Sequence, residues 1–237
     1  MKEPLEFFSQ NYPFDLQLTD HFVTGDLFTA VVLKNGNMGV CANPDGRITI
    51  DLYSKSFPNL DNYHDRIAYH AYLNALLNPD APTDIHSELT ELADFGRYKK
   101  VVMIGYFSNI AQKLSSNGIN MVIFDKNERN VPLADLAQLN SHLAEADAVI
   151  LTSSSIANNS FSDIISQTPE FCNIYLLGPS SLLHSDMFLY RNIKMIFGAK
   201  FQRYQKKIID IIAAGGCGRD FLPFASKVSA SAVGNLT

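Results

Sequence analysis

The sequence predicts an α/β protein: a Rossmann-like, mostly parallel sheet in the C-terminal part, preceded by a smaller α+β domain. Three observations carry this prediction. The run Val101–Ile104 is apolar without alternation, as expected for a strand buried on both faces. From there on, apolar runs alternate with segments of helical periodicity, which is typical of a doubly wound sheet. Before residue 97 the chain instead begins with strand-like runs and continues with helical ones.

The segment from Val101 to Asp125 is predicted to form the first crossover unit. Its first strand ends at Gly105. A helix follows and stops at Asn117-Gly118, where glycine can adopt the left-handed conformation that ends a helix. The second strand, 121–124, ends at Asp125. This order predicts a right-handed βαβ unit, and such sheets bind ligands at the carboxyl ends of their strands.

The rest of the C-terminal part continues this alternation. We expect further strands at 148–151, 174–177 and 194–197. Helices are expected at 133–146, 160–167 and 202–214, and a short helix precedes the last strand. The tail after Phe224 is small and polar, and we expect it to fray.

The N-terminal part is predicted to contain strands followed by helices. Its strongest signal is a β-hairpin, because strand-like runs at 27–33 and 38–42 flank Asn35-Gly36, a dipeptide that favours tight hairpin turns. Further elements are expected as a helix at 2–10, strands at 20–25 and 48–52, and helices at 67–76 and 86–94. The polar stretch 95–100 indicates a domain boundary. We therefore assign residues 1–96 to the front domain and 97–237 to the Rossmann-like domain.

Composition and charge restrict the function. The 237 residues have a formal net charge of -5, and no run of Lys and Arg suggests nucleic-acid binding. No apolar run approaches the roughly 18 residues of a membrane span. The three cysteines are odd in number and far apart, which predicts a reducing, cytoplasmic location and no disulfide framework.

Small or polar residues end four of the predicted strands, at Gly105, Asp125, Thr152 and Gly178. Glycine lets a ligand approach the backbone, N–H groups at a helix start favour an anion, and an acid can accept hydrogen bonds from a diol. Tight turns need such residues without any ligand as well. Four of them at one sheet edge nevertheless favour a binding site.

Known nucleotide-binding motifs do not account for this edge. G-x-G-x-x-G is absent, because no second glycine follows Gly105 until Gly118, and no Walker-type P-loop occurs. The six histidines show no metal-ligand spacing. The other concentrated signal is Gly215-Gly216-Cys217-Gly218-Arg219. Its arginine can grip a carboxylate or phosphate, or the segment can be a helix C-cap with Arg219 in a salt bridge.

Four segments together resemble one family: Val101–Phe107, Ala146–Thr152 with the following Asn158, Leu177–Ser181, and Gly215–Arg219. They are similar to the putative heavy-metal chelation family, whose Rossmann-like domain follows a domain resembling the N-terminal domain of enolase. The resemblance covers nearly the whole chain. It implies a polar cleft between two such domains, with a divalent or heavy metal ion as a cofactor or as part of the ligand. The chain departs from the family pattern at Ser153–Ser155, Asn159 and Cys217-Gly218, but hydroxyl groups and Arg219 are retained.

We therefore expect a protein that binds a small anionic or metal-complexed metabolite in the cleft between its domains, a role that includes heavy-metal chelation. The expected ligand-binding residues are Gly105, Tyr106, Asp125, Thr152, Asn158, Gly178, Ser180, Ser181 and Arg219. The alternative is an enzyme acting on a nucleotide-like or amino-acid-like molecule, with Tyr106, His184 or Cys217 as acid, base or nucleophile. A homo-oligomer assembled through the apolar front helix is a third possibility.

Overall fold

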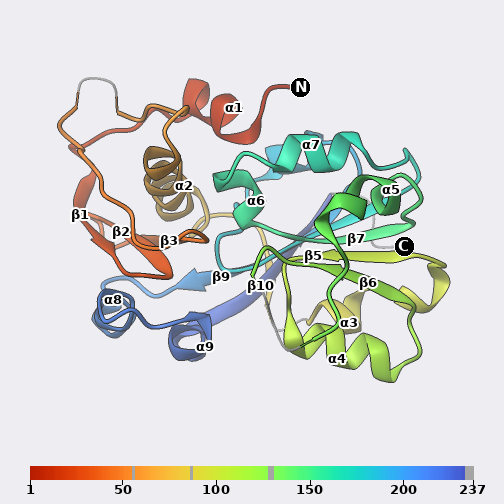
Figure 1. Ribbon diagram of the computed structural model, residues 1–237. Coiled ribbons are helices and arrows are strands. Elements are labelled where there is room, and N and C mark those ends of the chain that lie inside the picture. The colour runs from red at the N-terminus through yellow and green to blue at the C-terminus, as the bar shows by residue number, and fades with distance from the viewer. Residues whose placement is uncertain (55–56, 86–87, 128–130, 233–237) are drawn as a thin grey trace.

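The structure is a computed structural model, and it describes residues 1–54, 57–85, 88–127 and 131–232. It contains a three-stranded sheet of order β1-β2-β3 and a seven-stranded sheet of order β4-β10-β9-β8-β7-β5-β6 (Figure 1). The predicted α/β fold is confirmed. Among the described residues, no helix combines the length and the apolar character that a bilayer span needs.

The seven-stranded sheet is built around β5 (Val101–Ile104). Four strands run parallel to it: β6 (Met121–Phe124), β7 (Ala148–Thr152), β8 (Asn173–Leu177) and β9 (Ile193–Phe201). Because β5 lies between β6 and β7, the chain first moves to one side of β5 and then to the other. This reversal creates a topological switch point at the carboxyl end of β5, the place where open α/β sheets bind ligands.

Helices cover both faces of this sheet (Figure 1). On one face, α4 (Ser108–Ser116) packs beside α3 (Leu89–Leu92) and the turn η1 (Phe95–Arg97), over the side chains of Val101 and Met103. The other face carries α5 (Leu139–Leu143), α6 (Ser154–Ala157) and α7 (Phe161–Ser166). Two short 3-10 turns precede α5 and β9, namely η2 (Leu136–Gln138) and η3 (Ser185–Leu189). The predicted helix 133–146 is therefore too long. Helical structure begins only after Asp135, whose side chain accepts a hydrogen bond from the Ala137 amide.

The first part of the C-terminal tail forms β10 (Ala225–Ser231), so the fraying predicted for these residues is wrong, while 233–237 lie outside the described residues. β10 pairs antiparallel with β9 along its whole length and with β4 (Asp84–Ile85) on its other side. Only Val228 and Ala230 supply apolar burial, at 2% and 6% exposure. The strand is ordered because its backbone pairs with neighbours on both sides, which a local pattern does not reveal.

The front domain contains α1 (Pro4–Asn11), β1 (Thr19–Thr24), β2 (Phe28–Leu33), β3 (Met38–Ala42) and α2 (Tyr63–Leu77). The hairpin predicted at Asn35-Gly36 is confirmed, with Gly36 at a φ of 84°. The strand predicted at 48–52 is wrong. The backbone of Thr49 hydrogen-bonds to the His64 imidazole instead of to a neighbouring strand. Residues 86–87 of the helix predicted at 86–94 lie outside the described residues.

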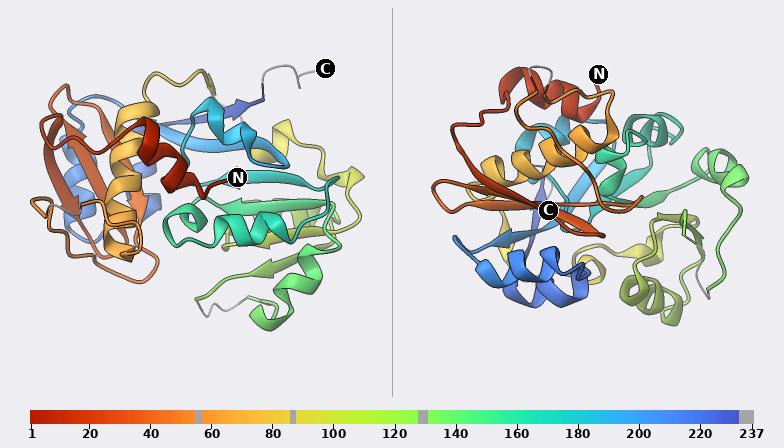
Figure 2. Two further views of the ribbon diagram at one scale, coloured as in Figure 1. Left: turned by 90° about the horizontal axis from the view of Figure 1, so that it is seen from above. Right: turned by 60° about the vertical axis from the view of Figure 1, so that its left-hand side comes forward.

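The three-stranded sheet lies between α2 on one face and α8 (Lys206–Ala213) and α9 (Gly218–Phe221) on the other (Figure 2). α2 approaches β3 so closely that a Cβ at Gly39 would lie 2.2 Å from the backbone nitrogen of Ala75. α8 starts later than the predicted helix 202–214, because Tyr204 has a positive φ of 56°. The turn η4 (Leu222–Phe224) leads from α9 into β10. Contacts thus cross the predicted boundary at residue 96 in both directions, since β4 joins the large sheet and α8 completes the front domain.

Four buried polar residues form a stripe along α2, hereafter the polar stripe: Arg66, His70, Asn74 and Asn78. They recur at every fourth position, so they lie on one face of the helix. Asn74 donates from Nδ2 to the carbonyls of Val40 (2.9 Å) and Ser180 (3.0 Å). The Nδ2 of Asn78 donates to the Ser181 carbonyl at 2.8 Å, and its Oδ1 accepts from the amide of Leu183 at 2.8 Å. The stripe therefore fixes the front domain to the segment that follows β8.

We predict that Asn78→Ala lowers the free energy of unfolding by roughly 2–4 kcal/mol, because it leaves a buried carbonyl and a buried amide without partners. Urea denaturation measures this change. Asn109→Ala, on the exposed face of α4, is the matched control and should change stability by no more than about 0.5 kcal/mol. Equal effects of the two substitutions would show that the Asn78 hydrogen bonds do not hold the domains together.

Candidate functional site

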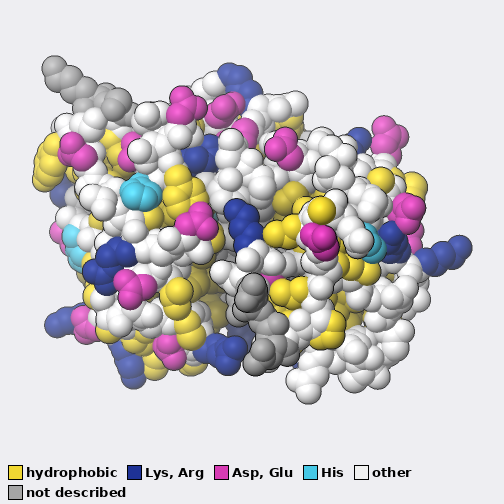
Figure 3. All heavy atoms as spheres, in the orientation of Figure 1, with side chains coloured by type: hydrophobic (Ala, Val, Ile, Leu, Met, Phe, Trp, Pro, Cys, Tyr) yellow, Lys and Arg dark blue, Asp and Glu magenta, His cyan; other side chains and the backbone are white. Residues whose placement is uncertain are grey.

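A cavity of about 640 Å³ lies at the carboxyl edge of the large sheet, where β5, β6 and β7 end. Pro44 of the front domain and residues of α5 and α7 complete its wall. In the space-filling view of the same side, hydrophobic side chains gather to the right of the middle of the face (Figure 3). The cavity thus lies at the topological switch point and touches both predicted domains. Five of the nine predicted site residues line it: Gly105, Tyr106, Asp125, Thr152 and Asn158.

Gly105 brings two of the cavity loops into contact. It has a φ of 85°, a left-handed conformation that favours glycine, and its amide donates to the Phe124 carbonyl at 2.8 Å. A Cβ at this position would lie 2.8 Å from the Cβ of Thr152. The turns after β5 and β7 therefore meet at van der Waals distance, and a side chain at residue 105 would force them apart.

Asp125 ties the β6 end of the cavity to the β5 end. Its Oδ2 accepts from the backbone amide of Tyr106 and its Oδ1 from that of Asn127, both at 2.8 Å. A carboxylate offers about four acceptor positions, so it can hold this turn and also accept from a ligand hydroxyl. The strand-end acid is thus half-buried at the cavity and is already part of its scaffold.

The end of β7 supplies hydroxyl and amide groups. The hydroxyls of Thr152 and Ser154 lie 2.9 Å apart. Asn158 accepts at Oδ1 from the amide (3.1 Å) and the hydroxyl (2.7 Å) of Ser160. These bonds orient Asn158, and within the described part of the chain its amide nitrogen has no hydrogen-bond partner. It can therefore donate to a ligand.

Three predicted residues after β8 stand outside the cavity lining. Gly178, at a φ of 134°, lies against the neighbouring turn, where an added Cβ would approach the Ser153 hydroxyl to 2.8 Å. Ser180 accepts from the Ala42 amide at 2.8 Å, and Ser181 donates to the Phe197 carbonyl at 2.7 Å. Both serines are buried; the Ser180 hydroxyl joins the domains and the Ser181 hydroxyl bonds within the large sheet, so neither faces the cavity.

Arg219 also lies outside the cavity lining, exposed on α9. The glycine-rich segment before it ends α8 and starts α9: Asp220 accepts from the Cys217 amide at 2.7 Å, as in a helix cap. Two of the residues proposed as catalytic groups, Cys217 and His184, are likewise absent from the lining. Cys217 lies in this cap. His184 contacts the Tyr12 hydroxyl at 3.2 Å in an aromatic cluster.

The sequence patterns did not single out the cavity residues of α5 and α7 or the polar stripe. Leu139, Asp163 and Gln167 line the cavity from those two helices. A signal for the stripe was present, because a polar residue at every fourth position of an otherwise apolar helix indicates a buried face with polar partners.

A buried cysteine and histidine lie next to each other between β3 and α2. The Sγ of Cys41 is 3.6 Å from Nδ1 of His70, and both residues are fully buried. Burial raises the pKa of the Cys41 thiol to about 12. Burial, aided by the nearby Arg66 charge, lowers the pKa of His70 to about 3. Both groups are therefore neutral near pH 7, and the pair packs the interface without acting as an activated nucleophile.

The described residues contain no group of three or more His, Cys, Asp or Glu that could hold a metal ion. Two carboxylates, Asp125 and Asp163, line the cavity.

Comparisons with known proteins agree with this fold. A family described as putative heavy-metal chelation (DUF364) matches residues 88–231. A protein with unknown function from this family, from Pyrococcus horikoshii, has a solved structure with a TM-score of 0.75 at 18% identity, covering 90% of this chain and 92% of that chain. A second one, from Desulfitobacterium hafniense DCB-2, has a TM-score of 0.73 at 18% identity, covering 97% of each chain. At this identity the likeness concerns the fold. No curated protein matches the chain, and the enolase-like character of the front domain stays a prediction.

We predict that Gly105→Ala destabilises the protein by roughly 1–3 kcal/mol more than Gly118→Ala does, because only the first substitution adds a steric clash to the unfavourable φ. Gly118 has a φ of 74° and nothing within 4 Å of an added Cβ. Gly118→Ala therefore measures the cost of the unfavourable φ alone. Denaturant unfolding of both variants measures the difference. Equal losses would mean that the turns after β5 and β7 do not touch.

We predict that His70 makes the protein less stable as the pH falls from about 6.5 towards 3. The unfolded chain binds a proton near pH 6.5, whereas the folded His70 resists protonation until about pH 3, so acid favours unfolding. His70→Asn should reduce the slope of unfolding free energy against pH in this range by up to roughly 1.4 kcal/mol per pH unit. Exposed His21 provides the control, His21→Asn. An unchanged slope in His70→Asn would contradict the prediction.

Proposed function

The chain belongs to the DUF364 family, described as putative heavy-metal chelation, and we propose that it binds a small hydroxyl-bearing metabolite in the cavity at the carboxyl ends of β5, β6 and β7. One observation carries the proposal: the cavity occupies the switch point of the parallel sheet, and three separate strand ends contribute polar groups to it. Its volume lies in the range of small-molecule sites, roughly 300–1,000 Å³.

The lining favours recognition through hydrogen bonds. Asp125 can accept from a diol such as that of ribose, Asn158 can donate, and Ser154 can do either. Apolar contact comes from Leu136 and Leu139. A lining that contains both polar and apolar groups suits a ligand that joins a sugar-like part to a flat, apolar part.

We expected Arg219 to supply the positive charge that binds an anion. Its side chain is not part of the cavity lining, so it cannot do so there. Among the described lining residues the charged groups are Asp125, Asp163 and Lys126. This balance supports a neutral ligand better than a multiply charged anion. Anionic metabolites are therefore included among the titrated compounds.

The metal named in the family description fits this proposal as part of the ligand. Three or more protein ligands are usual for a bound transition metal, and the described residues offer no such group. A heavy metal would therefore reach the cavity already complexed, with the metabolite supplying most of its ligand atoms. Binding is preferred to the enzyme alternative because, of Tyr106, His184 and Cys217, only Tyr106 lines the cavity.

Isothermal titration with adenosine, AMP, citrate and Cd²⁺ tests the proposal. Adenosine carries a ribose diol without a phosphate and should bind saturably. At 100 times its dissociation constant it should raise the free energy of unfolding by about 2.7 kcal/mol. Tighter binding of AMP or citrate than of adenosine would restore the anionic ligand. No binding of adenosine, AMP or citrate would overturn the proposal, and binding of Cd²⁺ alone would show that protein groups hold the metal.

We predict that Ser154→Ala weakens adenosine binding by roughly 1 kcal/mol, about fivefold, because one hydroxyl at the cavity is lost. Ser116→Ala, at the exposed end of α4, removes a hydroxyl that bonds only the Lys113 carbonyl and should leave the affinity unchanged. The same affinity in Ser154→Ala and in the unsubstituted protein would place the adenosine elsewhere.

A further inference from the structure

The short helix α6 places two of the cavity's polar residues. Ser154 begins it and Asn158 follows its last residue, and both line the cavity. The helix has one turn, and no side chain caps its start. A helix this short is not stable by itself, so contacts from elsewhere must fix its position. The orientation of Ser154 and Asn158 depends on those contacts.

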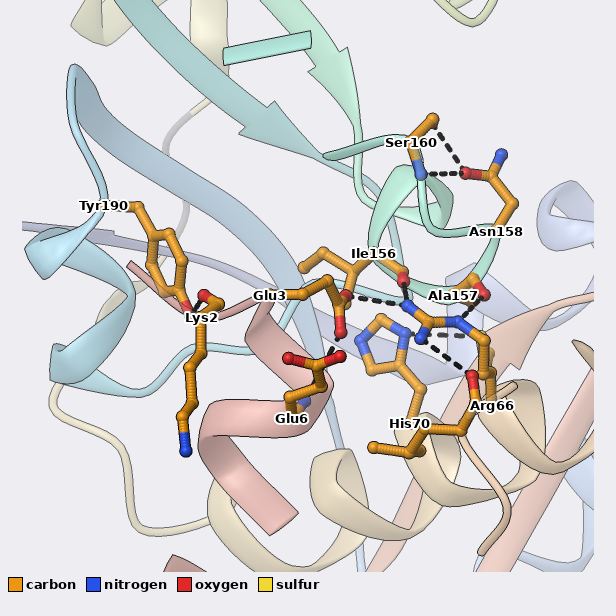
Figure 4. Close-up of polar contacts among 12 residues, drawn as sticks. Lys2, Glu3, Glu6, Arg66, His70, Ile156, Ala157, Asn158, Ser160 and Tyr190 are labelled. Carbon is orange, nitrogen blue, oxygen red and sulfur yellow. Dashed lines mark hydrogen bonds and ion pairs between the residues drawn. The ribbon is translucent and has the colours of Figure 1, made fainter. Parts of the chain in front are cut away.

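Arg66 of the polar stripe provides them from the other domain (Figure 4). Its Nε donates to the Ala157 carbonyl at 2.8 Å, and its Nη2 donates to the Ile156 carbonyl at 2.7 Å. The planar guanidinium thus binds the last two carbonyls of α6 at fixed geometry, in line with the preference of cations for helix C-termini. Its Nη1 donates to the Leu60 carbonyl at 3.2 Å, so the guanidinium itself is held in place.

Glu3 neutralises this buried cation. Its Oε1 accepts from Nη2 of Arg66 at 2.7 Å, and the two side chains are 9% and 5% exposed. The same carboxylate caps α1, because its Oε2 accepts from the Glu6 amide at 3.3 Å. Figure 4 shows that the Arg66 guanidinium lies between Glu3 and the end of α6. Asn158 and Ser160 lie on the side of α6 away from Glu3. Three chain segments therefore meet at one guanidinium beside the cavity.

We propose that Arg66 is a positioning residue for the cavity, which acts by holding the end of α6, and that Glu3 is the counter-charge it needs. This inference rests on the proposed function, since it assigns a residue that determines the affinity of that site. Glu3 would thus help to hold the cavity in shape, although it does not line the cavity. Loss of either partner should loosen 154–160 and weaken ligand binding without removing a group that contacts the ligand.

The chain offers a matched control in Lys200. Its Nζ donates to the carbonyls of Pro79 (3.2 Å) and Ala81 (2.6 Å), just after the end of α2. This cation also holds carbonyls near a helix C-terminus, but it is not part of the cavity lining. Arg191 is unsuitable, because it binds carbonyls at the end of α7, which does line the cavity.

The test compares Arg66→Lys, Glu3→Gln and Lys200→Met by amide hydrogen exchange and by adenosine titration, at a temperature where all are folded. The first two variants should speed exchange in 154–160 and raise the adenosine dissociation constant, each about tenfold, equivalent to about 1.4 kcal/mol. Lys200→Met should change neither. Glu3→Gln keeps the experiment decisive if Arg66→Lys does not fold, because it leaves the guanidinium in place.

Normal exchange in 154–160 in a folded Glu3→Gln or Arg66→Lys protein would overturn the inference, and so would an equal effect of Lys200→Met. The exchange measurement needs no ligand. If adenosine fails to bind the unsubstituted protein, the ribose form of the proposed function is wrong, while the exchange rates still decide whether Arg66 positions α6.

Discussion

The buried guanidinium of Arg66 is the interaction on which the relation between the two domains depends. An ionised side chain in the interior is costly unless nearly all of its donors are paired. Here it binds three carbonyls and the carboxylate of Glu3, and these partners come from α6, the segment before α2 and the N-terminal helix. Burial raises the pKa of Glu3, and the charge of Arg66 opposes that rise. Such a network requires one arrangement of its partners, so it favours a defined domain geometry more than it favours stability.

The rest of the polar stripe extends this constraint along α2. Asn74 and Asn78 hold the segment after β8 through its backbone, so this segment and the neighbouring cavity loop after β7 are both fixed to the same helix. Ser180 contributes in the opposite direction by accepting from the Ala42 amide. Hydrogen bonds to the front domain therefore set the position of α6, which forms part of the cavity wall.

The parallel strands and the hairpin were predictable because their signals are local. Val101–Ile104 is apolar throughout, and Asn35-Gly36 supplies the conformation that the turn needs. β10 was not predictable, because its small polar residues are ordered by pairing with distant strands. The same distinction applies to the site. Gly105 and Asp125 follow β5 and β6, and Thr152 ends β7, and topology brings such positions together. Ser180 and Ser181 are polar as well, but their hydroxyls bond a front-domain amide and a strand carbonyl, and Arg219 is exposed on α9. No sequence spacing specifies these positions.

The covering of the three-stranded sheet by α8 and α9 has a consequence for biosynthesis. Ala30, Val32 and Val40 face Ile208, Ile212 and Phe221, which the ribosome makes more than 160 residues later. Until those residues emerge, the nascent front sheet keeps one apolar face uncovered and cannot reach its final stability. Folding of the front sheet is thus tied to the synthesis of α8 and α9, and until then its uncovered apolar face is prone to aggregate.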